Sequence, residues 1–213
     1  MGEGFAMRWC LKHEVVVGSR DASKAKEAAE KYAKAAVEIY GSIAGTISGS
    51  DNISVAHGAD LVILSIPYES IEDTCSRLAP NISHECLVVS PIVPMSRTES
   101  GFVYVPMEQH KRTAAELVAD SLPPRRRVVS AFHTIAEAKL KNIQHGVDVD
   151  TFLCGDDEGA VTKLISITKE IPGLRPIYIG PLSVTYQAEM LTPMILNASR
   201  KNKLRNPGLR LVE

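Results

Sequence analysis

Three side chains that could bind a phosphate follow the first apolar run of the sequence. The run covers Glu14 to Val17, and the residues after it include Ser19, Arg20 and Lys24. Arginine offers a rigid fork of donors, serine a hydroxyl and lysine a point charge, all beside the N-terminus of the helix expected from Ala22. Together they predict a site for a dianionic phosphate. The alternative is an ordinary solvated surface, because the same helix is rich in Lys and Glu at i,i+4 spacing.

The position of these cations predicts which dinucleotide is bound. In a dinucleotide-binding βα unit, an acidic residue at this turn usually binds the adenosine ribose hydroxyls. Cations there accommodate a 2′-phosphate instead, so the sequence favours NADP over NAD. The glycine fingerprint G-x-G-x-x-G should lie about 20 residues earlier, and counting back from Arg20 reaches Gly2. We interpret Gly2 as the last glycine of a fingerprint whose leading glycines and first strand are missing.

Residues 1–12, MGEGFAMRWCLK, are then expected to be the rest of the first helix, with Phe5, Ala6, Trp9 and Cys10 on its inner side. The first strand of a doubly wound sheet is central, so its absence should leave the edges of its neighbours open. We expect that the start codon has been set too late. The alternative is a damaged version of the fold.

Three further apolar runs carry a serine at or just after their C-terminal end, where a loop begins. The runs cover residues 61–66, 86–89 and 128–131 and are almost continuously apolar, as strands covered on both faces should be. The loops read Ser65-Ile66-Pro67-Tyr68, Ser90-Pro91-Ile92-Val93-Pro94 and Ser130-Ala131-Phe132-His133-Thr134. Ligands of open parallel sheets bind beyond the carboxyl ends of the strands, so the loops predict a binding cleft. For any single loop, prolines that only end a strand are the alternative.

The elements around these residues alternate between apolar runs and helical patterns, which is typical of parallel βαβ units. Gly41 should end the helix after the phosphate-binding turn, Asp51 can cap a short helix, and residues 186–203 read as a final helix. Further strand candidates are residues 45–48, 151–154 and 176–179. We predict an α/β fold with a doubly wound, Rossmann-type, mostly parallel sheet over residues 1–180 and a small C-terminal helical lobe over residues 181–213.

Composition narrows the class of protein. The 213 residues are 45% hydrophobic with a net charge of −1, so one sizeable core is possible but nucleic acid or an anionic membrane is not an expected partner. The four cysteines form no CxxC pair, which favours free thiols in the cytoplasm over disulfides or a zinc site. No apolar run approaches the roughly 20 residues of a membrane span. Asp156 and Asp157 are interpreted as a helix cap, so no metal is predicted.

Several sequence blocks are similar to those of a known family, the coenzyme F-420-dependent NADP oxidoreductases of archaea and some bacteria. The blocks are HEVVVGSR, LSIPYES, VVSPIVPMSR, VVSAFHTI, LCGDD, PGLRPIYIGPL and LTPMILN. They follow one another in the family's order along nearly the whole chain. The resemblance implies an enzyme that is usually a homodimer, in which NADP and the deazaflavin coenzyme F-420 stack face to face and exchange a hydride directly.

The same resemblance implies roles by position. The NADP side would comprise Gly2, Ser19, Arg20, Lys24, Ser65, Ile66, Pro67, Tyr68, Ser90, Pro91, Val93, Pro94 and Ala138. The deazaflavin side would comprise His133, Thr192 and the backbone around Pro207. His133 is the candidate catalytic residue, because it could hydrogen-bond the pyrimidine edge and stabilise charge as it shifts. The alternative is a histidine that only packs at a strand end.

Some positions depart from the family pattern. Ala136 stands where Pro is frequent, and Tyr186 and Met190 replace more polar residues expected near the deazaflavin. The basic cluster of residues 200–205 could meet the anionic tail of that coenzyme or be a solvated helix end. Two rival functions remain: a different NADPH-dependent reductase that passes hydride to a flavin for metal-ion reduction, and a non-catalytic NADP-binding subunit.

Overall fold

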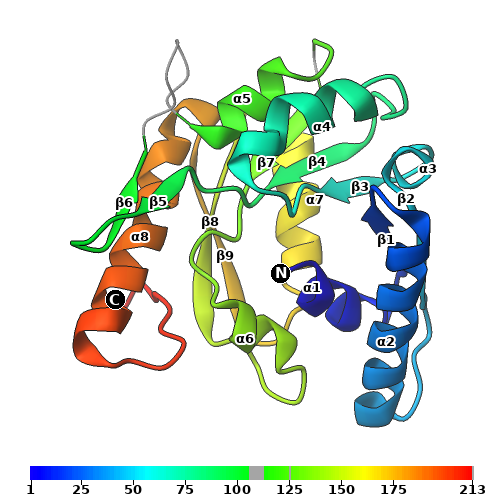
Figure 1. The fold of residues 1–213 in the computed structure, drawn as a ribbon, viewed down its shortest axis with the longest axis horizontal. Helices are drawn as coiled ribbons and strands as arrows, with labels where there is room; N and C mark the ends of the chain where they lie inside the picture. Colours follow the sequence, from blue (N-terminus) through cyan, green and yellow to red (C-terminus); the bar gives the residue numbers. More distant parts are fainter. Residues whose placement is uncertain (106–112, 125, 213) are drawn as a thin grey trace.

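The computed structural model describes residues 1–105, 113–124 and 126–212. Figure 1 shows strands surrounded by helices, with a long C-terminal helix and a small hairpin at one end. The strands are β1 Glu14–Ser19, β2 Thr46–Asp51, β3 Leu61–Ile63, β4 Leu87–Ser90, β5 Met95–Arg97, β6 Phe102–Tyr104, β7 Arg127–Ser130, β8 Val149–Gly155 and β9 Leu174–Gly180. The helices are α1 Gly2–Trp9, α2 Ala22–Tyr40, α3 Asn52–Ala56, α4 Ile71–Leu78, α5 Ala114–Asp120, α6 Glu137–Lys141, α7 Glu158–Thr168 and α8 Thr185–Asn202, with 3-10 turns η1 Tyr68–Ser70 and η2 Leu182–Val184.

Hydrogen bonding divides the described strands into three sheets. The main sheet has five strands in the order β3-β4-β7-β8-β9, and they run parallel except for the antiparallel pair β7–β8. Strands β1 and β2 form a parallel pair beside the β3 edge of this sheet, and β5 and β6 form an antiparallel hairpin (Figure 1). The predicted mostly parallel α/β sheet is therefore confirmed.

Strands β1 and β3 face each other with open edges. In the described part of the chain, β1 pairs only with β2, and β3 only with β4. These are the edges that the sequence predicts to be open when the central strand of the fold is absent. The two pieces, β2-β1 and β3-β4-β7, otherwise follow the strand order of a doubly wound sheet.

Helices cover the main sheet on both faces. Val88 and Val128 pack with residues of α4 and α5, whereas Leu87, Val89 and Val129 pack with residues of α1 and α7. The alternation follows from the pleat, since successive side chains of a strand point to opposite faces. Both faces are apolar, which is why these strands read as continuous hydrophobic runs.

A buried arginine attaches helix α1 to α6 and to the turn that follows it. The guanidinium of Arg8, 4% exposed, donates from Nε to the carbonyl of Leu140 at 2.7 Å. Its Nη2 donates to the carbonyls of Lys139, Asn142 and His145 at 2.9–3.0 Å. Burial lowers the pKa of Arg8, but the carbonyl oxygens at this helix end carry partial negative charge that offsets part of the desolvation. The predicted first helix, with its apolar side inward, is confirmed.

Helix α2 begins and ends as the sequence predicts. The carboxylate of Asp21 accepts from the amides of Ser23 and Lys24, which caps the N-terminus. Gly41 ends the helix with a φ of 76°, a conformation that glycine adopts without strain. The helix packs closely on β2, where a Cβ at Gly49 would collide with the backbone of Ala25.

Some details differ from the sequence predictions. The run 61–66 forms a strand only as far as Ile63, because the chain turns toward η1 before Pro67. Strand β8 is antiparallel to β7, although alternating elements predict parallel neighbours. The hairpin β5–β6 and helix α6 were not predicted. The final helix is confirmed within one residue at each end.

A buried carboxylate joins α8 to α5 and the hairpin. Glu189 is 0% exposed, and its Oε1 accepts from the amide of Ala114 at 3.0 Å, at the N-terminus of α5. Its Oε2 accepts from the hydroxyl of Tyr104 at 2.9 Å. Burial raises the pKa of Glu189 to about 8, with these hydrogen bonds offsetting part of the effect. The carboxyl group is therefore mostly protonated at neutral pH.

Glu189→Gln should remove a pH dependence of stability. The pKa of Glu189 is raised from 4.5 in the unfolded chain to about 8 in the folded one. Its stabilising contribution is therefore complete below the unfolded pKa and is lost as the pH rises through the folded pKa. Relative to the variant, the wild-type free energy of unfolding should fall by roughly 4 kcal/mol between pH 5 and pH 9, at about 1.4 kcal/mol for each pKa unit. Urea unfolding of both proteins at several pH values measures this difference. Plots of unfolding free energy against pH that run parallel for the two proteins would contradict the prediction.

Candidate functional site

The ends of three neighbouring strands form a buried polar edge. Strands β3, β4 and β7 are adjacent and parallel, so the loops after them meet at one side of the sheet. Ser90 and Ser130 are register partners at the ends of β4 and β7, and both are fully buried. Neither hydroxyl has a hydrogen-bond partner among the described residues. Buried polar groups are nearly always paired, so this edge is a candidate ligand site.

His133 lies in the loop after β7 and is 6% exposed. Neither Nδ1 nor Nε2 has a hydrogen-bond partner in the described ranges. Burial lowers the pKa of the imidazole to about 4, and the nearby Ser90 backbone offsets only part of this. The ring is therefore neutral at pH 7, with one donor and one acceptor nitrogen available.

The residue before His133 has a strained backbone. Phe132 has a φ of 71°, which is rare for a bulky residue, and its amide donates to Oγ1 of Thr151 at 2.8 Å. Its ring packs on Phe5 and Trp9 of α1, with centroids 4.7 and 6.2 Å away. Strain of this kind persists where the surroundings determine the conformation, and it is enriched at functional sites.

Two threonine hydroxyls attach this loop to neighbouring elements. Thr192 of α8 donates from Oγ1 to the carbonyl of His133 at 2.8 Å. Thr134 donates from Oγ1 to the carbonyl of Asp150 in β8 at 2.7 Å. The predicted residues His133 and Thr192 are thus in direct contact.

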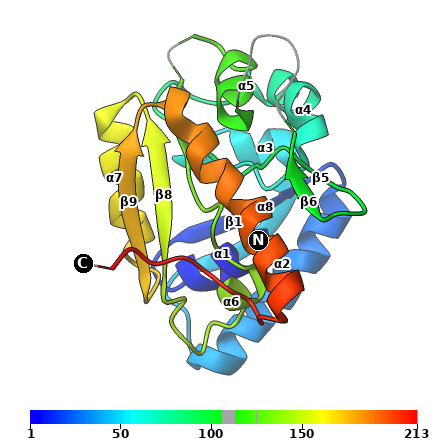
Figure 2. The same cartoon turned by 90° about the vertical axis from the view of Figure 1, so that its left-hand side faces the viewer.

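The C-terminal tail, residues 204–212, returns to this loop after α8. Figure 2 shows the tail passing α6 and running beside β8 and β9. Gly208 lies so close to β8 that a Cβ there would collide with the side chain of Val149, and the carbonyl of Thr134 would be 3.9 Å from it. Pro207, predicted for the deazaflavin side, is half-buried next to this contact.

A second region is the hollow at the end of β1. It is lined by Ser19, Arg20, Asp51, Asn52, Ile53, Asp73, Thr74, Arg77 and Leu78. Arg20 and Arg77 are both exposed, so two guanidinium groups border the hollow. The carboxylate of Asp51 is occupied in capping α3. Lys24 is exposed on α2 and does not line the hollow, so its contact with a phosphate stays a prediction.

The sequence analysis missed Arg77. In the sequence it is an ordinary helical residue with a partner four positions earlier, and the structure places its Nη1 3.9 Å from the carboxylate of Asp73. Such pairs are common on solvated helix faces. Only the packing of α4 against α3 brings this arginine to the same hollow as Arg20.

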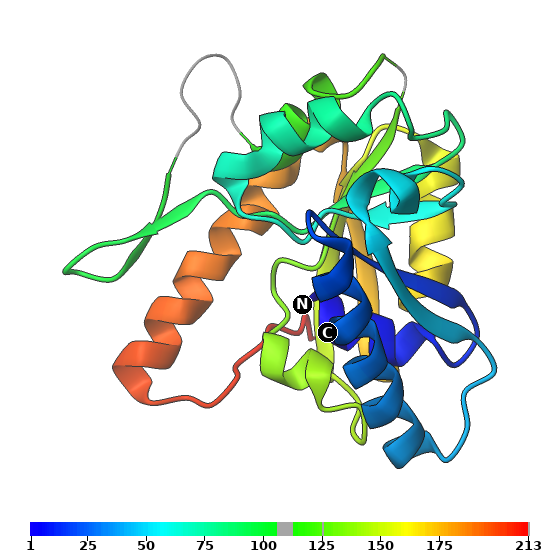
Figure 3. The same cartoon turned by 45° about the vertical axis from the view of Figure 1, so that its right-hand side comes forward.

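The remaining predicted residues lie around these two regions. Gly2 begins α1, and the amine of the preceding Met1 is 3.1 Å from Oε1 of Glu137, the residue before the exposed Ala138. Ser65 and Pro67 are exposed, Ile66, Tyr68 and Val93 are half-buried, and Pro91 and Pro94 are buried. Figures 1 and 3 show α2 and α8 on opposite sides of the main sheet. Of the predicted residues, Ser19 and Arg20 thus line the hollow next to α2, and His133 contacts Thr192 of α8.

The described residues contain no group of three or more His, Cys, Asp or Glu side chains that could hold a metal ion. Asp157 caps α7 by accepting from the amide of Ala160 at 2.6 Å, as the sequence predicts. The four cysteines are free and buried. None of the described helices is long and apolar enough to cross a membrane.

Comparison with known proteins identifies the family. Residues 1–94 match the family described as NADP oxidoreductase, coenzyme F420-dependent. The F420-dependent NADP reductase of Methanocaldococcus jannaschii is 33% identical over 210 residues, which cover 99% of this chain and 92% of the relative. The chain belongs to this family. The family's reductase from Methanothermobacter thermautotrophicus is 30% identical over 212 residues, which cover 99% of this chain and 89% of the relative.

A solved structure supports the fold of this family member. A crystallised candidate F420-dependent NADP reductase from Arthrobacter sp. FB24 superposes with a TM-score of 0.76 over 100% of this chain and 96% of that one. The two sequences are 19% identical, so the likeness concerns the fold alone. The predicted Rossmann-type architecture of this NADP oxidoreductase family is confirmed.

Arg20→Ala should weaken binding of NADPH much more than binding of NADH. Hydrogen bonds to a charged group contribute about 1.5–3 kcal/mol, so we expect a loss of roughly 10- to 100-fold for NADPH. NADH has no 2′-phosphate, and its dissociation constant should change less than about twofold. Arg77→Ala should act in the same direction, because both side chains border one hollow. Fluorescence titration measures both constants.

Lys31→Ala is the matched control, since Lys31 is an exposed cation on α2, the helix that follows Arg20, and does not line the hollow. Its affinity for both nucleotides should equal that of the wild type. Equal weakening of NADPH and NADH by Arg20→Ala would contradict the assignment of this turn.

Proposed function

We propose that the protein transfers a hydride reversibly between NADP and the deazaflavin coenzyme F-420. The observation that carries this proposal is the likeness, over 99% of the chain, to curated F420-dependent NADP reductases at 33% and 30% identity. The geometry adds two chemically different regions, a hollow at β1 bordered by two arginines and two aspartates, and a buried polar edge at β4 and β7. A reaction between two cofactors requires such a pair of regions.

The hollow at β1 fits the adenosine end of NADP. Arg20 and Arg77 supply guanidinium forks, which match the oxygens of a phosphate better than a single ammonium group does. Ser19 adds a hydroxyl, which accepts from the amide of Asp21 at 3.2 Å and can donate outward. Arg20 is exposed, whereas Arg77 also faces the carboxylate of Asp73 and would exchange that contact for one with the phosphate.

The loop after β7 fits the second cofactor. The two unpartnered nitrogens of His133 are the groups expected to hydrogen-bond the pyrimidine edge of the deazaflavin. Thr192 holds the backbone of His133, and Pro207 lies on the tail that packs beside the next residue of the loop. Because the ring is neutral, it donates or accepts without adding a buried charge.

When bound, the nicotinamide and deazaflavin rings supply the hydride donor and acceptor. The side chains of this protein therefore need to align and desolvate the rings rather than attack them. The stacked Phe5 and Trp9 and the ring of Phe132 form a rigid apolar support beneath the His133 loop. This support keeps the loop in one conformation and water out of the space beneath it.

We also propose a homodimer in the cytoplasm, with residues 1–180 as the NADP-binding domain and residues 181–213 as the lobe. Met190 and Met194 of α8 are 48% and 49% exposed, and Val103 of the adjoining hairpin is 40% exposed. This apolar strip supports a contact between two copies. Four free thiols are in keeping with a reducing compartment.

Mixing the protein with NADPH and oxidised coenzyme F-420 should bleach the deazaflavin absorbance in step with NADPH oxidation. NADH should be a much poorer donor. His133→Ala should lower kcat/KM for the deazaflavin about tenfold, or ~1.4 kcal/mol, through the loss of one hydrogen bond. His84→Ala is the matched control, because His84 is exposed and lies before β4 at the opposite edge of the sheet.

Two other outcomes would overturn the proposal. Oxidation of NADPH with a flavin but not with the deazaflavin would indicate the flavin-dependent reductase. Binding of NADPH without oxidation by either acceptor would indicate a non-catalytic NADP-binding subunit.

A further inference from the structure

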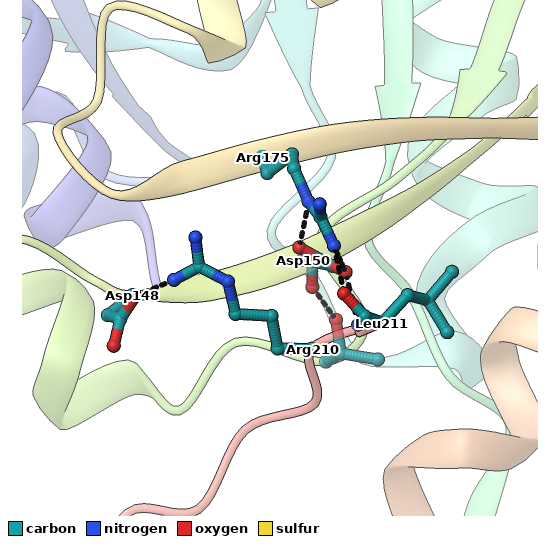
Figure 4. A network of polar contacts seen from close by, with 6 residues as sticks. Asp148, Asp150, Arg175, Arg210 and Leu211 are labelled. Atoms are coloured by element: carbon teal, nitrogen blue, oxygen red, sulfur yellow. Dashed lines mark hydrogen bonds and ion pairs between the residues drawn. The ribbon is translucent and has the colours of Figure 1, made fainter. Parts of the chain in front are cut away.

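Asp150, in β8, is the centre of a buried polar network (Figure 4). Its side chain is 0% exposed, and its two carboxylate oxygens accept from Nε and Nη2 of Arg175 at 2.7 and 2.8 Å. The pKa of Asp150 is lowered chiefly by these hydrogen bonds. Arg175 is on the neighbouring strand β9, in register with Asp150. The pair therefore forms a bidentate, charge-assisted contact across two paired strands.

The same residue holds the C-terminal tail. The amide of Asp150 donates to the carbonyl of Leu209 at 2.8 Å, and its Oδ2 accepts from the amide of Leu211 at 2.7 Å. Arg175 also donates from Nη2 to the carbonyl of Leu211. Figure 4 shows Arg210 reaching the other way, to the exposed carboxylate of Asp148. The hydrogen bonds that residues 207–212 make within the described structure run to these residues.

Asp150 is also joined to the loop that carries His133. Its carbonyl accepts from Oγ1 of Thr134, the residue that follows His133. One residue thus holds the His133 loop by its carbonyl, and the tail by its amide and its carboxylate. Between these two attachments Gly208 packs on Val149 with no room for a Cβ.

We propose that Asp150 and Arg175 are positioning residues that hold the tail as one wall of the deazaflavin side. This inference rests on the proposed function, because it takes the His133 loop as the deazaflavin-binding loop. The carboxylate is buried and its partners come from the tail and from β9, so removing Arg175 leaves a buried charge without its main counter-ion. The tail then loses the hydrogen bond from Arg175 to Leu211, and the carboxylate that binds the amide of Leu211 loses its counter-ion, whereas the hollow at β1 is untouched.

Two variants release the tail by different means. Arg175→Met removes the hydrogen bonds to Asp150 and Leu211, whereas Gly208→Ala leaves them in place and forces the tail off Val149 by steric collision. Arg127→Met is the matched control, since Arg127 is 37% exposed against 42% for Arg175 and is likewise paired with a carboxylate, 2.7 Å away on Glu85. Thermal unfolding establishes that each variant is folded.

Binding of oxidised deazaflavin, measured by its fluorescence, should weaken at least tenfold in both variants. The dissociation constant of NADPH should stay within twofold of the wild type, and KM for the deazaflavin should rise with little change in kcat. Hydrogen exchange of the tail amides should speed up in both. The double variant should bind the deazaflavin no more weakly than the weaker-binding single variant, because both changes release the same segment, the C-terminal tail.

The result that overturns the inference is unchanged deazaflavin affinity in folded Arg175→Met and Gly208→Ala proteins. Equal weakening of deazaflavin and NADPH would also overturn it, since that would indicate general destabilisation. These outcomes differ from a failure of the proposed function, because in that case the wild-type protein itself would not bind or reduce the deazaflavin.

Discussion

The attachment of α1 to the His133 loop is the constraint on which the candidate site depends. Phe5 and Trp9 stack with their ring centroids 4.9 Å apart, and both contact Phe132. On the same helix, Arg8 binds four backbone carbonyls around the end of α6. A guanidinium has a fixed planar geometry, so it sets orientation as well as distance. One short helix therefore fixes both Ala138 and His133 relative to the strand ends.

The two regions of the site differ in their electrostatics. At β1, exposed arginines face solvent, and their attraction for an anion is screened by salt. Near α8, the buried titratable groups are largely neutral at pH 7, because the pKa of His133 falls to about 4 and that of Glu189 rises to about 8. Uncharged side chains cost less to bury, so the interior around α8 can be dry without counter-ions. The exception is Asp150, which is charged and has its own arginine.

Local signals account for the parts of the fold that the sequence predicts. The strand at Glu14, the helix cap at Asp21 and the glycine end at Gly41 depend on residues within a few positions of one another. The direction of β8 and the hairpin depend on contacts between distant segments, and the sequence does not reveal them. The same contrast between local and long-range contacts explains which residues of the candidate site the sequence predicts. Ser19 and Arg20 follow a recognisable turn, whereas Arg77 joins them only through the packing of α4.

The tail gives the clearest case of a long-range feature. Residues 204–212 have no regular secondary structure and no periodic pattern. Their place is set by Asp150, more than 50 positions earlier in the chain, whose amide binds Leu209 and whose carboxylate binds Leu211. No local propensity predicts such a contact, although the unusual pairing of an acid and an arginine in adjacent strands could have indicated it.

The open edges of β1 and β3 have a mechanical consequence. No ladder of backbone hydrogen bonds joins these two strands in the described chain, so the packing of α1, α2, α3 and α4 and the single bridge between His57 and Ile82 help to set the spacing of the two regions. Packed side chains slide over one another at a smaller cost than a hydrogen-bonded ladder shears. The β1–β2 pair is therefore joined to the main sheet by packed side chains rather than by a continuous ladder, and a shift at the arginine end reaches the histidine end through these contacts.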